Sequence, residues 1–373
     1  MELNVVSPQE AKQIILAIVR KEEKTLPVML WGSPGIGKSS VVRQVTEELG
    51  IGFVDIRLLL FDPVDFRLPY FEEKDGKKRV VWARPSFLPE SGKGILFWDD
   101  MVSAPPSIQA AAYQVILDRK IGEHALGDGW YQVAAGNLET DRAIVHKMPS
   151  ALANRFAPHL LVKPSIEGWK VWAATHGINP LVVAFLSDPA NSHFLFKFEP
   201  ERDTKVFPSP RSWEGVSKIL SLGVEELTST KMIAGTVGDE VATAFEVYRK
   251  IGDKLPNFTD ILSGKVRSFE QIKGASEDPS YLFGTIAGLV NTFAAMANVS
   301  KQKLPMTLAM DNFFEFIMTL PKSEFIASAG ADIYAVYSEL SRLKKIHFAI
   351  SAIEGYLRFS QSEHGQRLVR ATM

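Results

Sequence analysis

A glycine-rich segment near the start of the chain carries the residue types that bind phosphate. The pattern G-x-x-x-x-G-K-[ST] begins at Gly32 and ends at Lys38 and Ser39. Glycines let the backbone wrap around a phosphate with its N–H groups pointing inward, and the N-terminus of a following helix adds partial positive charge. Lysine reaches the β- and γ-phosphates, and the serine hydroxyl is a ligand for Mg²⁺. The residues predicted to bind nucleotide are Gly32, Ser33, Pro34, Gly35, Ile36, Gly37, Lys38, Ser39 and Ser40.

A phosphate loop alone leaves kinases, GTPases, helicases and remodelling ATPases open, and two carboxylates narrow the choice. Asp99 and Asp100 end an apolar strand. Beside the phosphate loop in a parallel sheet, Asp99 would hold Mg²⁺ directly or through water, and Asp100 would orient and deprotonate the attacking water. Many such ATPases carry glutamate at the second position. Aspartate is one methylene shorter, so either hydrolysis is slow or the strand end lies closer to the water.

Three further polar residues suit a nucleotide site. Asn137 follows the strand expected at 131–135, where its amide would help to position water near the γ-phosphate. Arg155 lies near the end of a short helix and could reach the nucleotide of an adjacent subunit. Arg211 stands at the start of a later helix and could contact the γ-phosphate from a small domain. Taken singly, each is as well explained by a turn or a solvated surface charge.

The elements that must position these residues alternate between strand-like and helix-like patterns. An N-terminal helix is expected after the capping box formed by Ser7 and Glu10. Strands alternating with helices indicate a parallel sheet with helices on both faces. Strands are expected at 28–31, 52–60, 93–100 and 131–135, with helices at 38–49 and 107–117.

The second half of the chain changes character. From about residue 167 the apolar positions recur at helical spacing, and no clear period-two strand pattern is present. We therefore predict an α/β nucleotide-binding domain over 1–164, a small helical lid domain over 165–222, and an all-helical C-terminal region over 223–373. No motif in the last region points to a chemistry.

Composition excludes several classes of protein. The 373 residues carry 42 Lys and Arg against 43 Asp and Glu, a net charge of −1, which argues against a simple polyanion binder. Hydrophobic residues make up 46%, enough for a sizeable core, and no cysteine is present, which fits a reducing, cytoplasmic compartment. The uncharged stretch at 281–299 contains polar residues and is read as a helix buried in a soluble domain, so no membrane partner is expected. No two histidines have metal-ligand spacing.

Taken together, these motifs resemble the AAA+ ATPases, and within them the MoxR-like group. The likeness covers roughly residues 1–222, and its visible departure is Asp100 where glutamate is usual. It identifies 98–111 with a Walker B strand and helix start, Asn137 with sensor 1, Arg155 with the arginine finger and Arg211 with sensor 2. It implies a homo-oligomeric ring, commonly a hexamer, with ATP and Mg²⁺ bound between subunits. It also implies work on a protein client, often with a partner that carries a von Willebrand factor A domain.

Two predicted hairpins fit such a ring. The segment 70–82 has an Asp75-Gly76 turn between hydrophobic arms, and a second hairpin is expected at 121–130 with its turn at 127–129. Both could face a central pore and touch a client. The basic run at 77–79 reads equally well as a solvated turn.

Three alternatives stay open at the level of sequence. A nucleic-acid motor or loader on the same core would use the basic run at 77–79, although the net charge and the missing basic–aromatic stripe speak against it. A small-molecule kinase would need only the phosphate loop and an acceptor pocket. A nucleotide-gated scaffold that scarcely hydrolyses ATP is suggested by Asp100 alone, and normal turnover by the wild-type protein would exclude this hypothesis.

Overall fold

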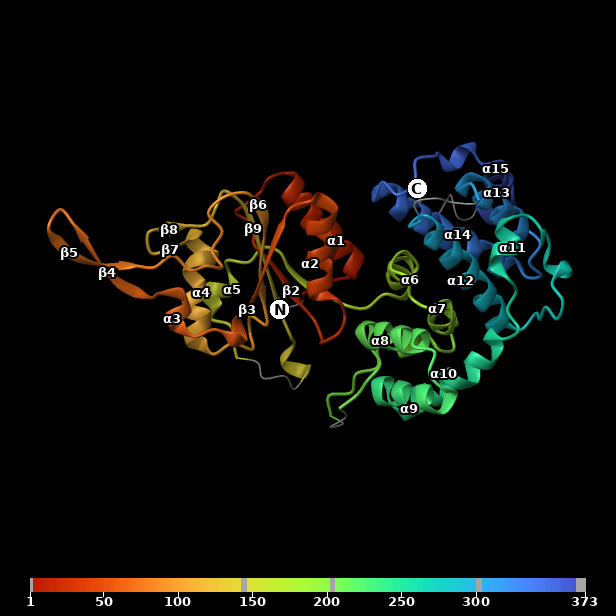
Figure 1. Cartoon of the computed structure of the whole chain (residues 1–373), viewed down its shortest axis with the longest axis horizontal. Coiled ribbons are helices and arrows are strands. Elements are labelled where there is room, and N and C mark those ends of the chain that lie inside the picture. The colour runs from red at the N-terminus through yellow and green to blue at the C-terminus, as the bar shows by residue number, and fades with distance from the viewer. Residues whose placement is uncertain (1–2, 142–145, 202–204, 300–303, 367–373) are drawn as a thin grey trace. The chain divides into compact units, whose positions relative to one another are not determined.

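The computed structural model describes residues 3–141, 146–201, 205–299 and 304–366. The chain divides into two compact units, which are described separately (Figure 1). The first consists of Met1–Ser165 with Pro200–Asp203, and the second of Ile166–Glu199 with Thr204–Met373.

The first unit is built on a parallel sheet with helices on both faces, as predicted. In the described part of the unit the sheet has six strands. Helices α1 and α2 cover one face, and α3, α4 and α5 lie on the other (Figure 1). In spatial order the strands are β1 (Asn4–Val6), β10 (His159–Val162), β2 (Val28–Trp31), β9 (Gly129–Gly136), β6 (Lys93–Asp99) and β3 (Gly52–Arg57). The helices are α1 (Pro8–Arg20), α2 (Lys38–Leu49), η1 (Leu58–Leu60), α3 (Pro63–Phe66), α4 (Pro106–Asp118), η2 (Glu139–Asp141) and α5 (Ser150–Ala153).

Local sequence explains most of these elements. The capping box at the start of α1 is confirmed, with the Ser7 hydroxyl accepting from the Glu10 N–H and the Glu10 carboxylate accepting from the Ser7 N–H. Strand β2 is apolar at every position because both faces of a parallel sheet are covered. The central strands then place Met29 and Trp98 in one buried cluster with Ile108 of α4. This cluster packs the central strands against α4.

Three details of the strands differ from the expectation. The strand predicted at 52–60 ends at Arg57, where a short 3₁₀ helix begins. The strand predicted at 93–100 ends at Asp99. It does not lie directly beside β2, because β9 is hydrogen-bonded between them. The carboxylates therefore approach the phosphate loop across the strand that ends near Asn137.

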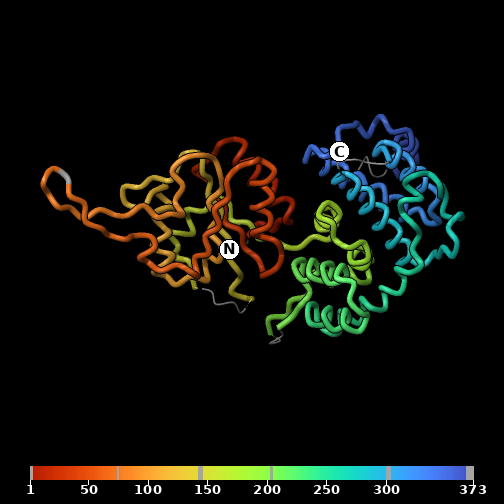
Figure 2. Tube along the Cα trace, in the orientation of Figure 1, coloured from red at the N-terminus to blue at the C-terminus, as the bar shows by residue number. Residues whose placement is uncertain are grey.

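One predicted hairpin is confirmed and the other is wrong in its turn. Strands β4 (Pro69–Lys74) and β5 (Lys77–Trp82) form an antiparallel ribbon that projects from the first unit (Figure 2). Asp75 and Gly76 both have positive φ, as a type I′ turn requires. The second hairpin consists of β7 (Lys120–Ile121) and β8 (His124–Ala125) and turns at residues 122–123. Gly129 instead begins β9, and its missing Cβ admits the backbone of Gly92.

The second unit is helical throughout its described residues, as predicted. Its core consists of two buried clusters, one from α6 to α10 and one mainly from α11 to α15. Helices on both sides of residue 222 share the first cluster, and the domain division at that residue stays a prediction. The helices are α6 (Ile166–Thr175), α7 (Pro180–Ser187), η3 (Ser192–Leu195), α8 (Pro210–Ser221), α9 (Glu226–Val237), α10 (Asp239–Gly252), α11 (Phe258–Leu262), η4 (Phe269–Gln271), α12 (Pro279–Met296), α13 (Met306–Ile317), α14 (Ser323–Arg342), η5 (Ile350–Ala352) and α15 (Glu354–Gln361).

Helix α12 accounts for the uncharged stretch of the sequence. Most of its residues are buried, and it packs against α7, α6 and α14 within the second unit. Across the described residues, none of the helices combines the length and apolar character needed to cross a bilayer.

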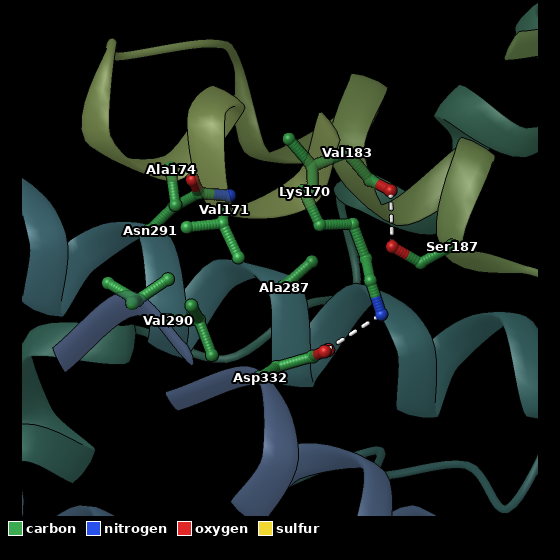
Figure 3. Close-up of a pocket in the computed structure, with 10 residues that line it drawn as sticks. Lys170, Val171, Ala174, Val183, Ser187, Ala287, Val290, Asn291 and Asp332 are labelled. Atoms are coloured by element: carbon green, nitrogen blue, oxygen red, sulfur yellow. Dashed lines mark hydrogen bonds and ion pairs between the residues drawn. The ribbon is translucent and has the colours of Figure 1, made fainter. Parts of the chain in front are cut away.

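A polar seam lies where the two clusters of the second unit meet. Figure 3 shows the Lys170 amine of α6 directed at the Asp332 carboxylate of α14, at 2.8 Å. Burial lowers the pKa of Lys170, but Asp332 and Glu167 together outweigh it, so the pKa is raised and the amine stays charged. Both amide atoms of the buried Asn291 lack a hydrogen-bond partner among the described residues. The pocket at this seam is lined by Lys170, Val171, Ala174, Val183, Ser187, Ala287, Val290, Asn291, Asp332 and Val336.

We expect this ion pair to matter for stability mainly when it is broken on one side. Asp332→Leu leaves the buried Lys170 charge with Glu167 as its remaining carboxylate and should lower the free energy of unfolding by about 3 kcal/mol, because the largely exposed Glu167 offsets only part of the cost of desolvating that charge. Lys170→Met combined with Asp332→Leu should recover most of that loss. Urea unfolding followed by far-ultraviolet circular dichroism measures both, and a double variant as unstable as the single one contradicts the expectation.

Candidate functional site

The phosphate loop has the backbone that its glycines allow. It runs from the end of β2 to the first turn of α2, and Gly32 and Gly37 have φ of 151° and 102°. A Cβ on Gly32 would lie 2.4 Å from the side chain of Ile36 and 2.7 Å from the carbonyl of Val162. Both positions therefore need glycine, one for close packing and both for their dihedrals. The loop is a preformed cradle with the α2 N-terminus at its end.

Lys38 joins the loop to the neighbouring strand. Its Nζ donates to the Gly32 carbonyl at 2.6 Å, to the Ser33 carbonyl at 3.0 Å and to the Asn137 Oδ1 at 3.0 Å. The side chain is buried, so these oxygens offset part of the cost of desolvating its charge. Sequence reasoning placed Lys38 and Asn137 at one site, and the structure brings them into contact.

Ser39 and Asp99 meet at the same sheet edge. The Ser39 hydroxyl donates to Asp99 Oδ2 at 3.0 Å, while Asp99 Oδ1 accepts from the Asp100 N–H at 3.1 Å. A hydroxyl and a carboxylate side by side are the oxygen ligands that Mg²⁺ prefers. No group of three or more acidic or histidine side chains suited to a metal is found in the described ranges.

Asp100 has a backbone that the sequence did not indicate. Its φ is 53°, in the left-handed region, directly after the last residue of β6. Aspartate tolerates this region better than most residues, but a non-glycine residue there stores strain of the kind found at functional sites. The Ser103 N–H donates to the Asp100 carbonyl and the Met101 N–H to the carbonyl of Ala135, which hold the turn. The strand thus ends sharply, with the Asp100 side chain partly buried at the site.

Sequence reasoning missed two aspartates near this edge. The buried Asp141 accepts from the Ser33 hydroxyl at 2.9 Å and from the Leu138 N–H at 3.1 Å, so it ties the phosphate loop to the segment after Asn137. Asp55 lies on β3, where burial and then the Asp99 charge raise its pKa while Arg57 and Arg43 oppose the shift. Its buried Oδ1 has no hydrogen-bond partner among the described residues. A polar residue inside an otherwise apolar strand was the signal available for Asp55.

The two arginines are placed differently. Arg155 lies two residues after α5, in the first unit, and is exposed. It forms no side-chain hydrogen bond or ion pair with any residue that the structure describes. Arg211 occupies the first turn of α8 in the second unit, behind the capping box of Ser209 and Ser212, and is also exposed. Its predicted contact with nucleotide stays a prediction.

Residues 28–163, which contain every one of these groups except Arg211, match the model of the ATPase family associated with various cellular activities (AAA). They form an AAA ATPase domain. The match assigns nucleotide binding and ATP hydrolysis to this domain, and it begins at the first residue of the strand before the phosphate loop.

Solved structures with some likeness to the chain are distant from it. NtrX from Brucella abortus is 17% identical over 77% of this chain, with a TM-score of 0.35, and the chain spans only 64% of NtrX. RuvB from Thermotoga maritima is 17% identical over 69% of this chain and 75% of its own, with a TM-score of 0.39. A comparison with curated proteins finds no match. The assignment of the AAA domain therefore rests on the family match.

Proposed function

We propose that this chain is a MoxR-like AAA+ ATPase that forms a cytoplasmic ring, commonly a hexamer, and uses Mg²⁺-dependent ATP hydrolysis to remodel a protein client. One observation carries the proposal. Lys38, Ser39, Asp99 and Asn137 converge at one sheet edge, where two hydrogen bonds join Lys38 to Asn137 and Ser39 to Asp99, while the Arg155 side chain of the same unit is exposed. This arrangement is expected of a ring in which each subunit binds nucleotide through the clustered residues and receives an arginine from the next subunit.

The residues of the AAA domain suit a nucleotide with its metal. The loop N–H groups and the Lys38 ammonium would hold the β- and γ-phosphates, and Ser39 with Asp99 would hold Mg²⁺. When bound, Mg²⁺ neutralises charge on the phosphate oxygens. The carboxylate of Asp55, whose Oδ1 has no hydrogen-bond partner in the described ranges, adds negative potential near Asp99 that favours a divalent cation here.

Asp100 and Asn137 would handle the water. Asp100 would accept its proton, and Asn137, already within reach of the γ-phosphate lysine, would orient it. The left-handed backbone at Asp100 re-aims a short side chain at a point where the strand would otherwise continue. We infer that this turn compensates for the methylene that aspartate lacks relative to glutamate. Arg211 would complete the site as the γ-phosphate sensor.

The β4–β5 ribbon supports a protein client over a nucleic acid. Phe71 and Val80 lie opposite each other across the strands and are 79% and 59% exposed. Two of the three cations of β5 stand directly opposite acids of β4, with Arg79 across from Glu72 and Lys78 across from Glu73, which reduces their attraction for a phosphate backbone; the third, Lys77, is across from Lys74. An exposed apolar pair with balanced charge suits an extended polypeptide. The resemblance further predicts a partner with a von Willebrand factor A domain.

The ribbon provides the test of the client. Replacing Phe71 and Val80 together by serine should reduce the stimulation of ATP turnover by an unfolded model polypeptide by at least about tenfold, because two apolar anchors of this size each contribute roughly 1.5–3 kcal/mol when fully buried. Nucleotide binding should persist. Serine at the exposed Val247 of α10 serves as the matched control.

Two measurements distinguish this proposal from a nucleic-acid motor and from a protein that forms no ring. Assembly into a ring is measured by sedimentation with a slowly hydrolysed ATP analogue. Stimulation by duplex DNA that falls steeply with salt, with no response to polypeptide, would reverse the choice in favour of a nucleic-acid motor. A protein that stays monomeric in the analogue contradicts the ring.

A further inference from the structure

A histidine outside the family motifs connects the phosphate loop to the arginine segment. His159 is the first residue of β10 and lies between Trp31, the last residue of β2, and Ala153, the last residue of α5. The Trp31 indole N–H donates to His159 Nδ1 at 2.9 Å. The other ring nitrogen, Nε2, lies 2.8 Å from the Ala153 carbonyl.

The tautomer of this imidazole follows from its partners. An indole N–H can only donate, so His159 Nδ1 must accept and carries no hydrogen. A carbonyl can only accept, so Nε2 must carry the hydrogen and donate. Two directed bonds therefore run in series from Trp31 through a neutral imidazole to Ala153. Any side chain that replaces this imidazole would need one acceptor and one donor in the same geometry to keep both bonds.

Each end of this pair of hydrogen bonds lies one or two residues from a group of the nucleotide site. Trp31 precedes Gly32, whose carbonyl accepts from the Lys38 ammonium. Ala153 precedes Asn154 and Arg155, and its carbonyl, at the end of a four-residue helix, also accepts from the Phe156 N–H at 3.1 Å. Rings reinforce the connection. The His159 ring lies nearly parallel to that of Trp31, at an interplanar angle of 12°, and meets the ring of Phe156 edge-on, so it contacts residues on both sides of the Asn154–Arg155 pair.

We propose that His159 is a positioning residue that couples the nucleotide state of its own subunit to the placement of Arg155. A phosphate that moves the Gly32 backbone shifts Trp31, and the two hydrogen bonds carry that shift to the carbonyl two residues before the arginine. The arginine offered to the neighbouring subunit then depends on what the donor subunit has bound. This inference rests on the proposed role of Arg155 across a subunit interface.

Mixed rings test the coupling. One parent, the finger subunit, carries Asp100→Asn and keeps Arg155. The other, the catalytic subunit, carries Arg155→Ala and keeps Asp100. Each alone should be nearly inactive, while mixing restores turnover wherever a catalytic site meets an intact arginine.

A second substitution, placed on one subunit or the other, then tests the coupling. His159→Phe keeps an aromatic side chain but removes both hydrogen bonds. On the finger subunit it should lower the restored turnover by about tenfold or more, because displacing a catalytic group by about 1 Å costs up to about a hundredfold. On the catalytic subunit the same change should cost less than about twofold. His159→Gln, whose amide offers one acceptor and one donor, should retain most of the turnover on either subunit.

Controls separate the coupling from a loss of structure. His347→Phe changes an exposed histidine of the second unit and should have no effect on either subunit. Should His159→Phe fail to assemble, Trp31→Phe on the finger subunit removes the N–H donor, keeps an aromatic side chain in the cluster of the sheet and should reproduce the tenfold loss. Equal losses on both subunits, or none on the finger subunit, overturn the coupling and leave the trans-acting arginine standing. Parent mixtures that restore no turnover overturn the trans arginine and the coupling with it.

Discussion

Lys38→Ala should abolish tight ATP binding and lower turnover by at least about a hundredfold, because the ammonium is the only cation placed inside the described loop. The structure gives this substitution a second consequence. Nζ also holds the carbonyls of Gly32 and Ser33 and the Asn137 amide oxygen, so its removal releases the loop from β9. Affinity for ADP should therefore fall as well, although less than affinity for ATP.

Titration with a fluorescent ATP analogue and a phosphate-release assay measure both losses. Lys21→Ala, at an exposed lysine just after α1, is the matched control and should behave as wild type. Thermal unfolding checks that the variant keeps its fold. A Lys38→Ala protein that binds ATP with unchanged affinity contradicts the assignment of the loop.

Arg155→Ala should leave ATP binding intact and reduce turnover by about a thousandfold, the scale of an arginine that stabilises transition-state charge. The structure explains why binding should survive. Arg155 is exposed and holds no described group in place through its side chain, so its removal leaves no buried charge unpaired. Thermal stability should accordingly stay within about 0.5 kcal/mol of wild type.

Turnover per site must be compared at a protein concentration where the ring is assembled. Arg267→Ala, at an exposed arginine of the second unit, is the matched control for loss of a surface charge. Unchanged turnover in an assembled ring would sink the arginine-finger role, and loss of ATP binding would instead place Arg155 in its own subunit's site.

Local elements of this protein could be predicted because their causes are local. The strand, glycine turn and helix around Lys38 follow from apolar runs and from glycine at left-handed positions. The hairpin at Asp75–Gly76 follows from a dipeptide that adopts positive φ twice. The hairpin predicted at 127–129 was wrong because glycine there serves close packing against Gly92 and not a turn, and sequence alone cannot tell these uses apart.

The site divides in the same way between sequence and tertiary structure. By itself, the sequence determined the phosphate loop, the acidic strand end and the residues that follow each strand, because each depends on neighbours a few positions away. Only the tertiary structure decided that β9 separates β2 from β6, that Asp55 lies near Asp99, and that His159 bridges two segments. These are pairings of residues far apart in the chain, and they are set by the burial of every strand at once, which no short pattern records.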